Sequence, residues 1–294
     1  MKTHTVVTDK SDYDKVGKVN MNDIYNMREP TDYFLRLSSL DYQIPQEAKP
    51  RFQRLIEARR RATGSEAAKV VDIGCSYGIN GALLKHHLSM DDLYRHYAAV
   101  EPSDSEARLV RDRNFYAEPA DPALTMIGID PADRALSYAI DMGILDAGIS
   151  TDLETRDPTP EDAATIENAD LIISTGCIGY VTETTLERLL KSSYRSNPWM
   201  AHFVLRMFDF SASEEMLRRH GYVTEKVDGL FRQRRFASAN ERRHVLDNLH
   251  RLGIDATGAE ADGWYLAELH VARPEKNAKS VPLGEILGGS TDVI

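Results

Sequence analysis

The sequence predicts an α/β fold: a doubly wound, mostly parallel seven-stranded sheet with helices on both faces, plus an N-terminal helical cap and a helical insertion. Three observations support this fold class. Short runs rich in β-branched residues alternate with helical patterns along most of the chain, as a parallel sheet with crossover helices requires. The first such run, at residues 69–73, leads directly into a glycine-containing turn and a helix. Helical patterns also precede this strand, which places additional helices outside the sheet.

The composition favours a small-molecule partner. The 294 residues suit one large domain, and 36 Lys and Arg against 46 Asp and Glu give a formal net charge of −10. Such a chain has no general attraction to nucleic acid or to anionic membrane surfaces. The start has no signal-peptide pattern, and no run approaches the roughly 18 apolar residues that cross a membrane, so we expect a cytoplasmic protein. The oligomeric state stays open.

The chain divides into three expected regions. Residues 1–62 form a polar arm followed by the helical cap, and residues 275–294 form a peripheral tail. Residues 63–274 form the Rossmann-like core, with the helical insertion at 90–123. Aromatic side chains in the cap are the expected lid over a substrate: Tyr25, Tyr33 and Tyr42.

Each element of the core follows from its pattern. Strands are expected at 69–73, 124–129, 148–153, 171–175, 203–208, 222–227 and 264–271. Helices are expected at 79–88, 134–142, 182–191, 211–220 and 240–252. Ser211 and Glu214 have the spacing of a capping box, and Gly221 supplies a helix stop.

The turn after the first strand carries the strongest functional signal. It has the sequence Asp-Ile-Gly-Cys-Ser-Tyr-Gly at residues 72–78. Gly74 and Gly78 allow the main chain to approach a ligand, and the helix that follows presents unpaired N–H groups. The Lys-Ser/Thr pair of a P-loop is missing, and Ser76 replaces the middle glycine of a dinucleotide fingerprint. Nucleoside triphosphate and NAD are therefore disfavoured as ligands.

This turn resembles the first motif of the class I S-adenosylmethionine-dependent methyltransferases, in which an acidic residue precedes a Gly-x-Gly-x-Gly type turn. Asp72, Gly74 and Gly78 match that motif, and Ser76 departs from it. The resemblance covers about residues 65–272. It implies that S-adenosyl-L-methionine is the cofactor and that the turn holds its methionine moiety, through Asp72, Gly74, Cys75, Ser76, Tyr77 and Gly78.

The resemblance also implies an acidic residue at the end of the second strand, bound to the ribose hydroxyls. Glu101 and Asp130 compete for this role. Asp130, followed by Pro131, is preferred because it has the better strand before it and the better helix after it. The alternative reading is that Asp130 only caps the following helix.

Further site residues follow the later strands. Asp152 and Leu153 resemble the family position that contacts the adenine. Thr175 and Gly176 follow the fourth strand, where the ligand crevice of an open parallel sheet lies. Tyr180, in the same segment, is the leading catalytic residue, and a packing role is the alternative.

Three further polar patterns remain: Arg206, the basic run at residues 231–236, and the histidines and cysteines. Arg206, at the end of the fifth expected strand, is a second catalytic candidate that could clamp a substrate carboxylate; a structural ion pair is the alternative. Residues 231–236 interleave arginines with aromatics, and we expect a solvated strand edge there. No histidine spacing matches a metal motif, and two cysteines, Cys75 and Cys177, are too few for a disulfide scaffold, so no metal or disulfide is assigned.

The leading functional hypothesis is therefore methyl transfer from S-adenosyl-L-methionine to a small molecule in specialised metabolism. One alternative changes the chemistry: the cap-rich layout weakly resembles the azetidine-2-carboxylate synthases, which cyclise the cofactor and release methylthioadenosine. A second alternative is a non-catalytic module that only binds the cofactor.

Overall fold

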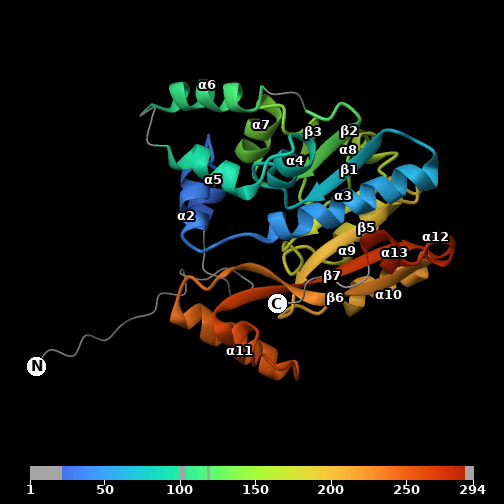
Figure 1. The fold of residues 1–294 in the computed structure, drawn as a ribbon. Coiled ribbons are helices and arrows are strands. Elements are labelled where there is room, and N and C mark those ends of the chain that lie inside the picture. Colours follow the sequence, from blue (N-terminus) through green and yellow to red (C-terminus); the bar gives the residue numbers. More distant parts are fainter. Residues whose placement is uncertain (1–21, 100–103, 118–119, 289–294) are drawn as a thin grey trace, which may run out of the picture.

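The computed structural model describes residues 22–99, 104–117 and 120–288 (Figure 1). In this part of the chain a seven-stranded sheet has the order β3-β2-β1-β4-β5-β7-β6. Strands β1 to β5 are parallel, and β7 runs antiparallel to both β5 and β6. The α/β class and the mostly parallel seven-stranded sheet are confirmed. The strands are β1 (Ala68–Ile73), β2 (Leu124–Ile129), β3 (Ala147–Ile149), β4 (Leu171–Thr175), β5 (Trp199–Leu205), β6 (Tyr222–Arg235) and β7 (Trp264–Pro274).

The strand order reverses direction between β1 and β4, and this reversal positions the site. In open α/β sheets the ligand crevice lies outside the carboxyl ends of the strands at such a point. Ile73, the last residue of β1, pairs with Ile129 of β2 and with Ser174 of β4. The segments that follow these three strands therefore begin side by side at one edge of the sheet.

Helices cover both faces of the sheet and bury two apolar clusters (Figure 1). Because strand side chains alternate in direction, Val70 joins one cluster and its neighbour Val71 joins the other. The first cluster includes side chains of α3 (Ile44–Thr63), α4 (Ile79–Lys85), α7 (Asp133–Asp141) and α11 (Ala239–Arg251). The second includes side chains of α8 (Pro160–Ile166), α9 (Glu183–Ser192) and α10 (Ser211–Arg219).

Helices also occupy both segments expected outside the core. The N-terminal segment contains α1 (Asn22–Tyr25), α2 (Thr31–Ser38) and α3, and the segment between α4 and β2 contains α5 (Met90–Ala98) and α6 (Ser105–Phe115). Helices α2 and α5 lie side by side (Figure 1), and Phe34 stacks on Tyr97 with ring centroids 4.3 Å apart. The cap and the insertion thus share an aromatic contact.

Several strands differ from their expected bounds: β5 spans Trp199–Leu205 rather than 203–208, and β6 continues to Arg235 rather than ending at 227. Strand β3 ends at Ile149, so Asp152 and Leu153 lie in the following turn. Helix α3 continues through Pro50 because its apolar face is fully buried, which outweighs the lost backbone hydrogen bond.

Three smaller expectations also need correction. Ser211 forms no capping box with Glu214, since its hydroxyl donates to Asp209 Oδ2 over 2.8 Å. Helix α8 was not expected. The tail is not entirely peripheral, because it forms α12 (Glu275–Ser280) and α13 (Leu283–Leu287), and the side chains of Leu283 and Leu287 are buried in the first cluster.

Within the described ranges, no helix combines the length and apolarity needed to cross a membrane.

Candidate active site

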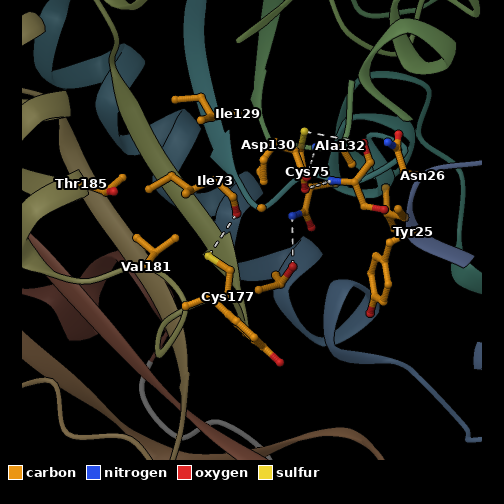
Figure 2. Close-up of a pocket in the computed structure, with 18 of the residues that line it drawn as sticks. Tyr25, Asn26, Ile73, Cys75, Ile129, Asp130, Ala132, Cys177, Val181 and Thr185 are labelled. Carbon is orange, nitrogen blue, oxygen red and sulfur yellow. Dashed lines mark hydrogen bonds between the residues drawn. The ribbon is translucent and has the colours of Figure 1, made fainter. Parts of the chain in front are cut away.

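A cavity of about 570 Å³ opens at the carboxyl ends of the parallel strands (Figure 2). Its volume lies within the usual range for small-molecule sites. Segments after β1, β2, β3 and β4 line one part of it, and the N-terminal cap and the end of β6 line the rest. In Figure 2, Cys177 and Val181 lie on one side and Tyr25 and Asn26 on the other.

The turn after β1 has a left-handed backbone conformation at three of its residues. Gly74, Ser76 and Gly78 have φ values of 66°, 49° and 76°. Ser76 therefore adopts the conformation of the glycine that it replaces, which is uncommon for a residue with a side chain. Its backbone N–H donates to Asp130 Oδ2 over 2.8 Å. Its hydroxyl oxygen is buried and has no hydrogen-bond partner in the described part of the chain.

The two glycines are required by neighbouring protein atoms. A Cβ on Gly74 would lie 2.6 Å from Cys177 Cβ, and a Cβ on Gly78 would lie 2.8 Å from Ile144 Cγ2. Gly78 is the N-cap of α4 and does not line the cavity. Packing against the protein therefore requires a glycine at both positions, and of the two only Gly74 lines the cavity.

Tyr77 connects the turn to the N-terminal segment and also lies outside the cavity lining. Its hydroxyl donates to Ile24 O over 3.0 Å and accepts from Met27 N over 2.8 Å. Tyr77 therefore fixes the position of the cap on the turn. Three members of the expected loop set do line the cavity: Gly74, Cys75 and Ser76.

Asp72 is fully buried behind this turn. Its Oδ1 accepts a hydrogen bond of 3.0 Å from Asn80, a residue that does line the cavity. Burial raises the pKa of Asp72 to about 8, against a lowering effect of the Asn80 hydrogen bond. The carboxyl is therefore largely protonated at neutral pH.

Asp130 lies at the end of β2 and lines the cavity together with Pro131. Its Oδ1 accepts from Ala132 N over 2.9 Å, and its Oδ2 accepts from Ser76 N. Burial raises the pKa of Asp130. The carboxylate thus joins the turn after β1 to the start of α7. The competing residue, Glu101, lies outside the described residues.

The turn after β3 contributes four consecutive lining residues, Thr151 to Glu154. Asp152 and Leu153 were expected, and Glu154 was not. Asp152 Oδ1 accepts from Glu154 N over 3.0 Å. Glu154 accepts from Thr182 N over 2.8 Å and from Thr185 Oγ1 over 2.6 Å, at the start of α9. No sequence pattern points to Glu154, because its partners lie about thirty residues further along the chain.

Thr175, Gly176 and Tyr180, expected after β4, all line the cavity. Arg206 is absent from the cavity lining. Its guanidinium donates to Glu260 Oε2 over 2.8 Å and to the backbone oxygen of Asp255 over 2.9 Å. Arg206 is therefore engaged in the structural ion pair that the sequence left open as the alternative, and its expected role as a substrate clamp is not supported.

The three cap tyrosines, Tyr25, Tyr33 and Tyr42, line the cavity. Tyr25 and Tyr33 meet edge to face, with ring centroids 5.4 Å apart. Burial raises the pKa of Tyr33 and of Tyr42, so both phenols stay neutral at ordinary pH.

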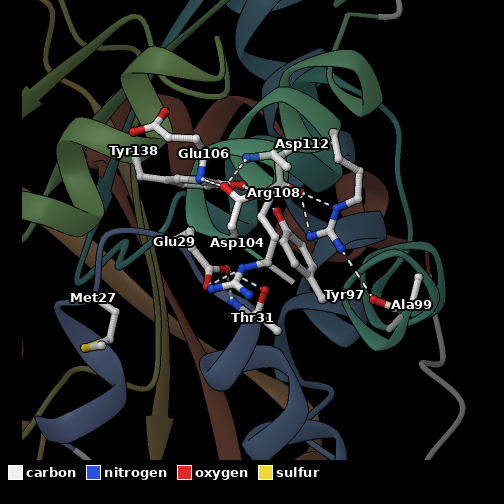
Figure 3. A network of polar contacts seen from close by, with 12 residues as sticks. Met27, Glu29, Thr31, Tyr97, Ala99, Asp104, Glu106, Arg108, Asp112 and Tyr138 are labelled. Atoms are coloured by element: carbon white, nitrogen blue, oxygen red, sulfur yellow. Dashed lines mark hydrogen bonds and ion pairs between the residues drawn. The ribbon is translucent and has the colours of Figure 1, made fainter. Parts of the chain in front are cut away.

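Polar contacts hold the cap against the insertion (Figure 3). Arg108 of α6 pairs with Glu29 over 3.1 Å, and Glu106 of α6 pairs with Arg28. The Arg108 and Glu29 side chains are only 27% and 11% exposed, so this pair is the more protected of the two. Residues 27–29 are thus held by α6 and by Tyr77.

The end of β6 also reaches the cavity, which corrects the expectation of a solvated strand edge. Gln233 and Arg234 are each 6% exposed, and both line the cavity. The physical reason is that the N-terminal cap covers this edge: Gln43 N donates to Gln233 O over 2.8 Å, and Arg235 N donates to Leu40 O over 2.7 Å. No local sequence pattern predicts this long-range pairing.

Among the residues that the structure describes, no group of three His, Cys, Asp or Glu side chains could hold a metal ion. Both cysteines are free thiols.

No protein-family model matches the sequence, and no curated protein matches it. Solved structures of methyltransferases are similar to it at low identity. The N-methyltransferase NodS from Bradyrhizobium japonicum, in complex with S-adenosylhomocysteine, is 14% identical over 86% of this chain and 95% of its own, with a TM-score of 0.39. The magnesium protoporphyrin IX methyltransferase ChlM from Synechocystis, with bound S-adenosylmethionine, is 11% identical over 76% and 80%, with a TM-score of 0.36. A TehB-like S-adenosylmethionine-dependent methyltransferase from Corynebacterium glutamicum is 16% identical over 73% and 85%, with a TM-score of 0.35.

Proposed function

We propose that the protein is a methyltransferase that binds S-adenosyl-L-methionine in this cavity and transfers the methyl group to a small molecule. One observation carries the proposal. Residues at or after the ends of four strands line one cavity. These are the glycine turn after β1, Asp130 after β2, Asp152 with Leu153 after β3, and Thr175 with Gly176 at the end of β4. The sequence resemblance assigns the turn, Asp130, and Asp152 with Leu153 to the methionine, ribose and adenine parts of one ligand, and Thr175 with Gly176 follow the strand that borders the ligand crevice.

The cavity has the polar groups that such a ligand requires. Each oxygen of Asp130 accepts one backbone N–H and keeps a lone-pair direction for a ribose hydroxyl. Asp152 accepts from the exocyclic amine of the adenine, and Leu153 packs on the ring. The buried Ser76 hydroxyl has no protein partner in the described residues, which suits a ligand group beside the turn.

The bound cofactor supplies an electrophilic methyl group on a sulfonium, so the protein needs neither a nucleophile of its own nor a metal. The task of the chain is to align the acceptor with that carbon and to exclude water. Tyr180 is positioned for the first task, since it lines the cavity after β4. Its hydroxyl would orient the nitrogen or oxygen of the acceptor, whose proton would pass to solvent after the new bond forms.

The cap tyrosines serve the second task. Tyr25, Tyr33 and Tyr42 line the cavity from the N-terminal cap and would cover the bound ligand. Each ring in contact with a sulfonium would add about 0.5–2 kcal/mol by cation–π attraction. A closed aromatic lid suits a small acceptor better than a macromolecular one.

Incubation of the purified protein with S-adenosyl-L-methionine alone, followed by calorimetry and product analysis, tests this proposal. We expect binding without turnover, and S-adenosylhomocysteine only when an acceptor is added. Release of methylthioadenosine from the cofactor alone would instead identify a cyclase. Binding with no product under any acceptor would identify a cofactor-binding module, and no binding would refute the cofactor assignment.

A further inference from the structure

Near its end, strand β6 carries an extra residue opposite β7, and this residue is Gln233. The register passes from Arg232 opposite Leu266 directly to Arg234 opposite Tyr265. Consecutive residues of a regular strand face opposite sides of a sheet, and a bulge changes the direction of a side chain. Here the bulge allows two consecutive residues, Gln233 and Arg234, to be buried and to line the same cavity.

The side-chain amide of Gln233 packs against Gly176, but its oxygen has no hydrogen-bond donor in the described part of the chain. Its nitrogen lies against Gly176, where a Cβ would be only 2.2 Å from Nε2, and Gly176 has a φ of 92° that also disfavours a side chain. Its Oε1 is buried and accepts no hydrogen bond from any of the described residues. A buried amide acceptor without a donor lowers the stability of a folded protein and calls for an explanation. A ligand with an N–H or O–H group supplies the missing donor.

The charges around the cavity limit what this ligand can be. The guanidinium of Arg234 is 7% exposed and forms two hydrogen bonds, of 3.0 and 2.8 Å, with the fully buried carboxylate of Glu241. Its positive charge is therefore already compensated. The remaining ionisable groups of the lining include the carboxyl groups of Asp130, Asp152 and Glu154. The cavity consequently favours neutral or cationic groups over anions.

We propose that Gln233 determines the acceptor class: its Oε1 accepts a hydrogen bond from an amine or hydroxyl compound that carries no anionic group. This inference rests on the proposed function, since the compound is the methyl acceptor. The rings of Tyr42 and Tyr180, which line the same cavity, provide apolar walls for the body of that compound. Gln233 therefore acts as a specificity residue beside the cofactor.

The test compares two substitutions with different hydrogen-bonding capacity. Gln233→Met keeps the volume but removes the acceptor, whereas Gln233→Glu keeps an acceptor oxygen. Gln53→Met, at an exposed glutamine of α3, is the matched control. Each protein is assayed by calorimetry with S-adenosylhomocysteine, by thermal unfolding without ligand, and by S-adenosylhomocysteine release from S-adenosyl-L-methionine with a panel of amines, phenols, alcohols and carboxylic acids.

We expect all variants to bind S-adenosylhomocysteine within about 2-fold of wild type. Gln233→Met should raise the melting temperature of the free protein by about 2–4 °C, because an unsatisfied buried acceptor is removed. For the best acceptor, KM should rise at least about 10-fold in Gln233→Met and stay within about 3-fold of wild type in Gln233→Glu.

Other outcomes of the same assays would overturn the specificity role of Gln233. A lower melting temperature in Gln233→Met would show that the Gln233 amide stabilises the folded protein. An unchanged KM, a preference for carboxylic acids, or no methylated amine or hydroxyl compound would overturn the specificity role while cofactor binding still stands. Failure of the wild-type protein to bind S-adenosylhomocysteine would instead defeat the proposed function itself.

Discussion

Asn80 donates a hydrogen bond of 3.0 Å from its side-chain amide to the buried carboxyl of Asp72. The same amide donates to Thr175 Oγ1 over 3.2 Å, so Asp72 on β1 is linked to the cavity wall at the end of β4. Asp72 Oδ2 has no partner among the described residues. An ionised Asp72 would therefore leave one charged oxygen without a donor, which is why burial raises its pKa to about 8.

Asp72→Asn should change how stability depends on pH. The pKa of Asp72 in the folded protein, about 8, lies above its ordinary value of 3.8, so the folded state binds the proton more tightly. The resulting stabilisation is present below about pH 4 and is lost as the pH rises through about 8. Asn carries no proton to lose. The melting temperature of Asp72→Asn relative to that of wild type should therefore rise between about pH 5 and 8.5.

Thermal unfolding across this pH range measures the effect, with Asp141→Asn as an exposed control. Curves for wild type and Asp72→Asn that run parallel would show that the carboxyl is ionised in the folded protein throughout.

Gly74→Ala should destabilise the fold through a clash with Cys177. The added Cβ would lie 2.6 Å from Cys177 Cβ at a φ of 66°. Gly143→Ala is the matched control, since Gly143 has a φ of 73° and nothing within 4 Å of the added Cβ. We expect Gly74→Ala to cost about 1–3 kcal/mol more than Gly143→Ala in urea unfolding. Equal losses would mean that only the backbone conformation matters.

Local patterns predicted the sheet well because buried parallel strands have a clear sequence signature. Strands β2 and β4 match their expected bounds, and the turn after β1 keeps its conformation despite Ser76. The same reasoning located Asp130, since a carboxyl group directly after a buried strand must lie at the sheet edge.

What the sequence did not reveal depends on long-range contacts. The sequence predicts a solvated edge at residues 231–236, because this basic run is short and isolated in an acidic chain. The cap covers that edge through the Gln43 and Arg235 backbone bonds, and Glu241 neutralises Arg234. Arg206, expected as a substrate clamp, donates instead to Glu260 Oε2 over 2.8 Å. Neither pairing has a signature in local spacing.

Asp130→Ala should weaken cofactor binding by about 1.5–3 kcal/mol, the range for hydrogen bonds to a charged group. Glu101→Ala should have a much smaller effect. Calorimetry with S-adenosylhomocysteine compares the two variants, and thermal unfolding reports the separate loss of the Ser76 and Ala132 hydrogen bonds. A larger effect of Glu101→Ala would transfer the ribose role to Glu101.

Arg108→Ala should loosen the cap, because it removes the protected ion pair with Glu29. A partly exposed pair contributes modestly, so the affinity for S-adenosylhomocysteine should fall by about 2- to 5-fold. Arg113→Ala, at an exposed position of the same helix, should leave the affinity unchanged. If both variants bind like wild type, closure of the cap does not depend on this contact.

Tyr180→Phe should separate a role in the reaction from a role in packing. The change keeps the ring that lines the cavity and removes only the hydroxyl. If the hydroxyl orients the acceptor, turnover should fall by about 10- to 100-fold, equivalent to roughly 1.4–2.7 kcal/mol of transition-state stabilisation. The affinity for S-adenosylhomocysteine should stay nearly constant, because the residues assigned to the cofactor are untouched. Wild-type turnover would reduce Tyr180 to a wall of the cavity, whereas a large fall in melting temperature would assign its hydroxyl to a structural hydrogen bond.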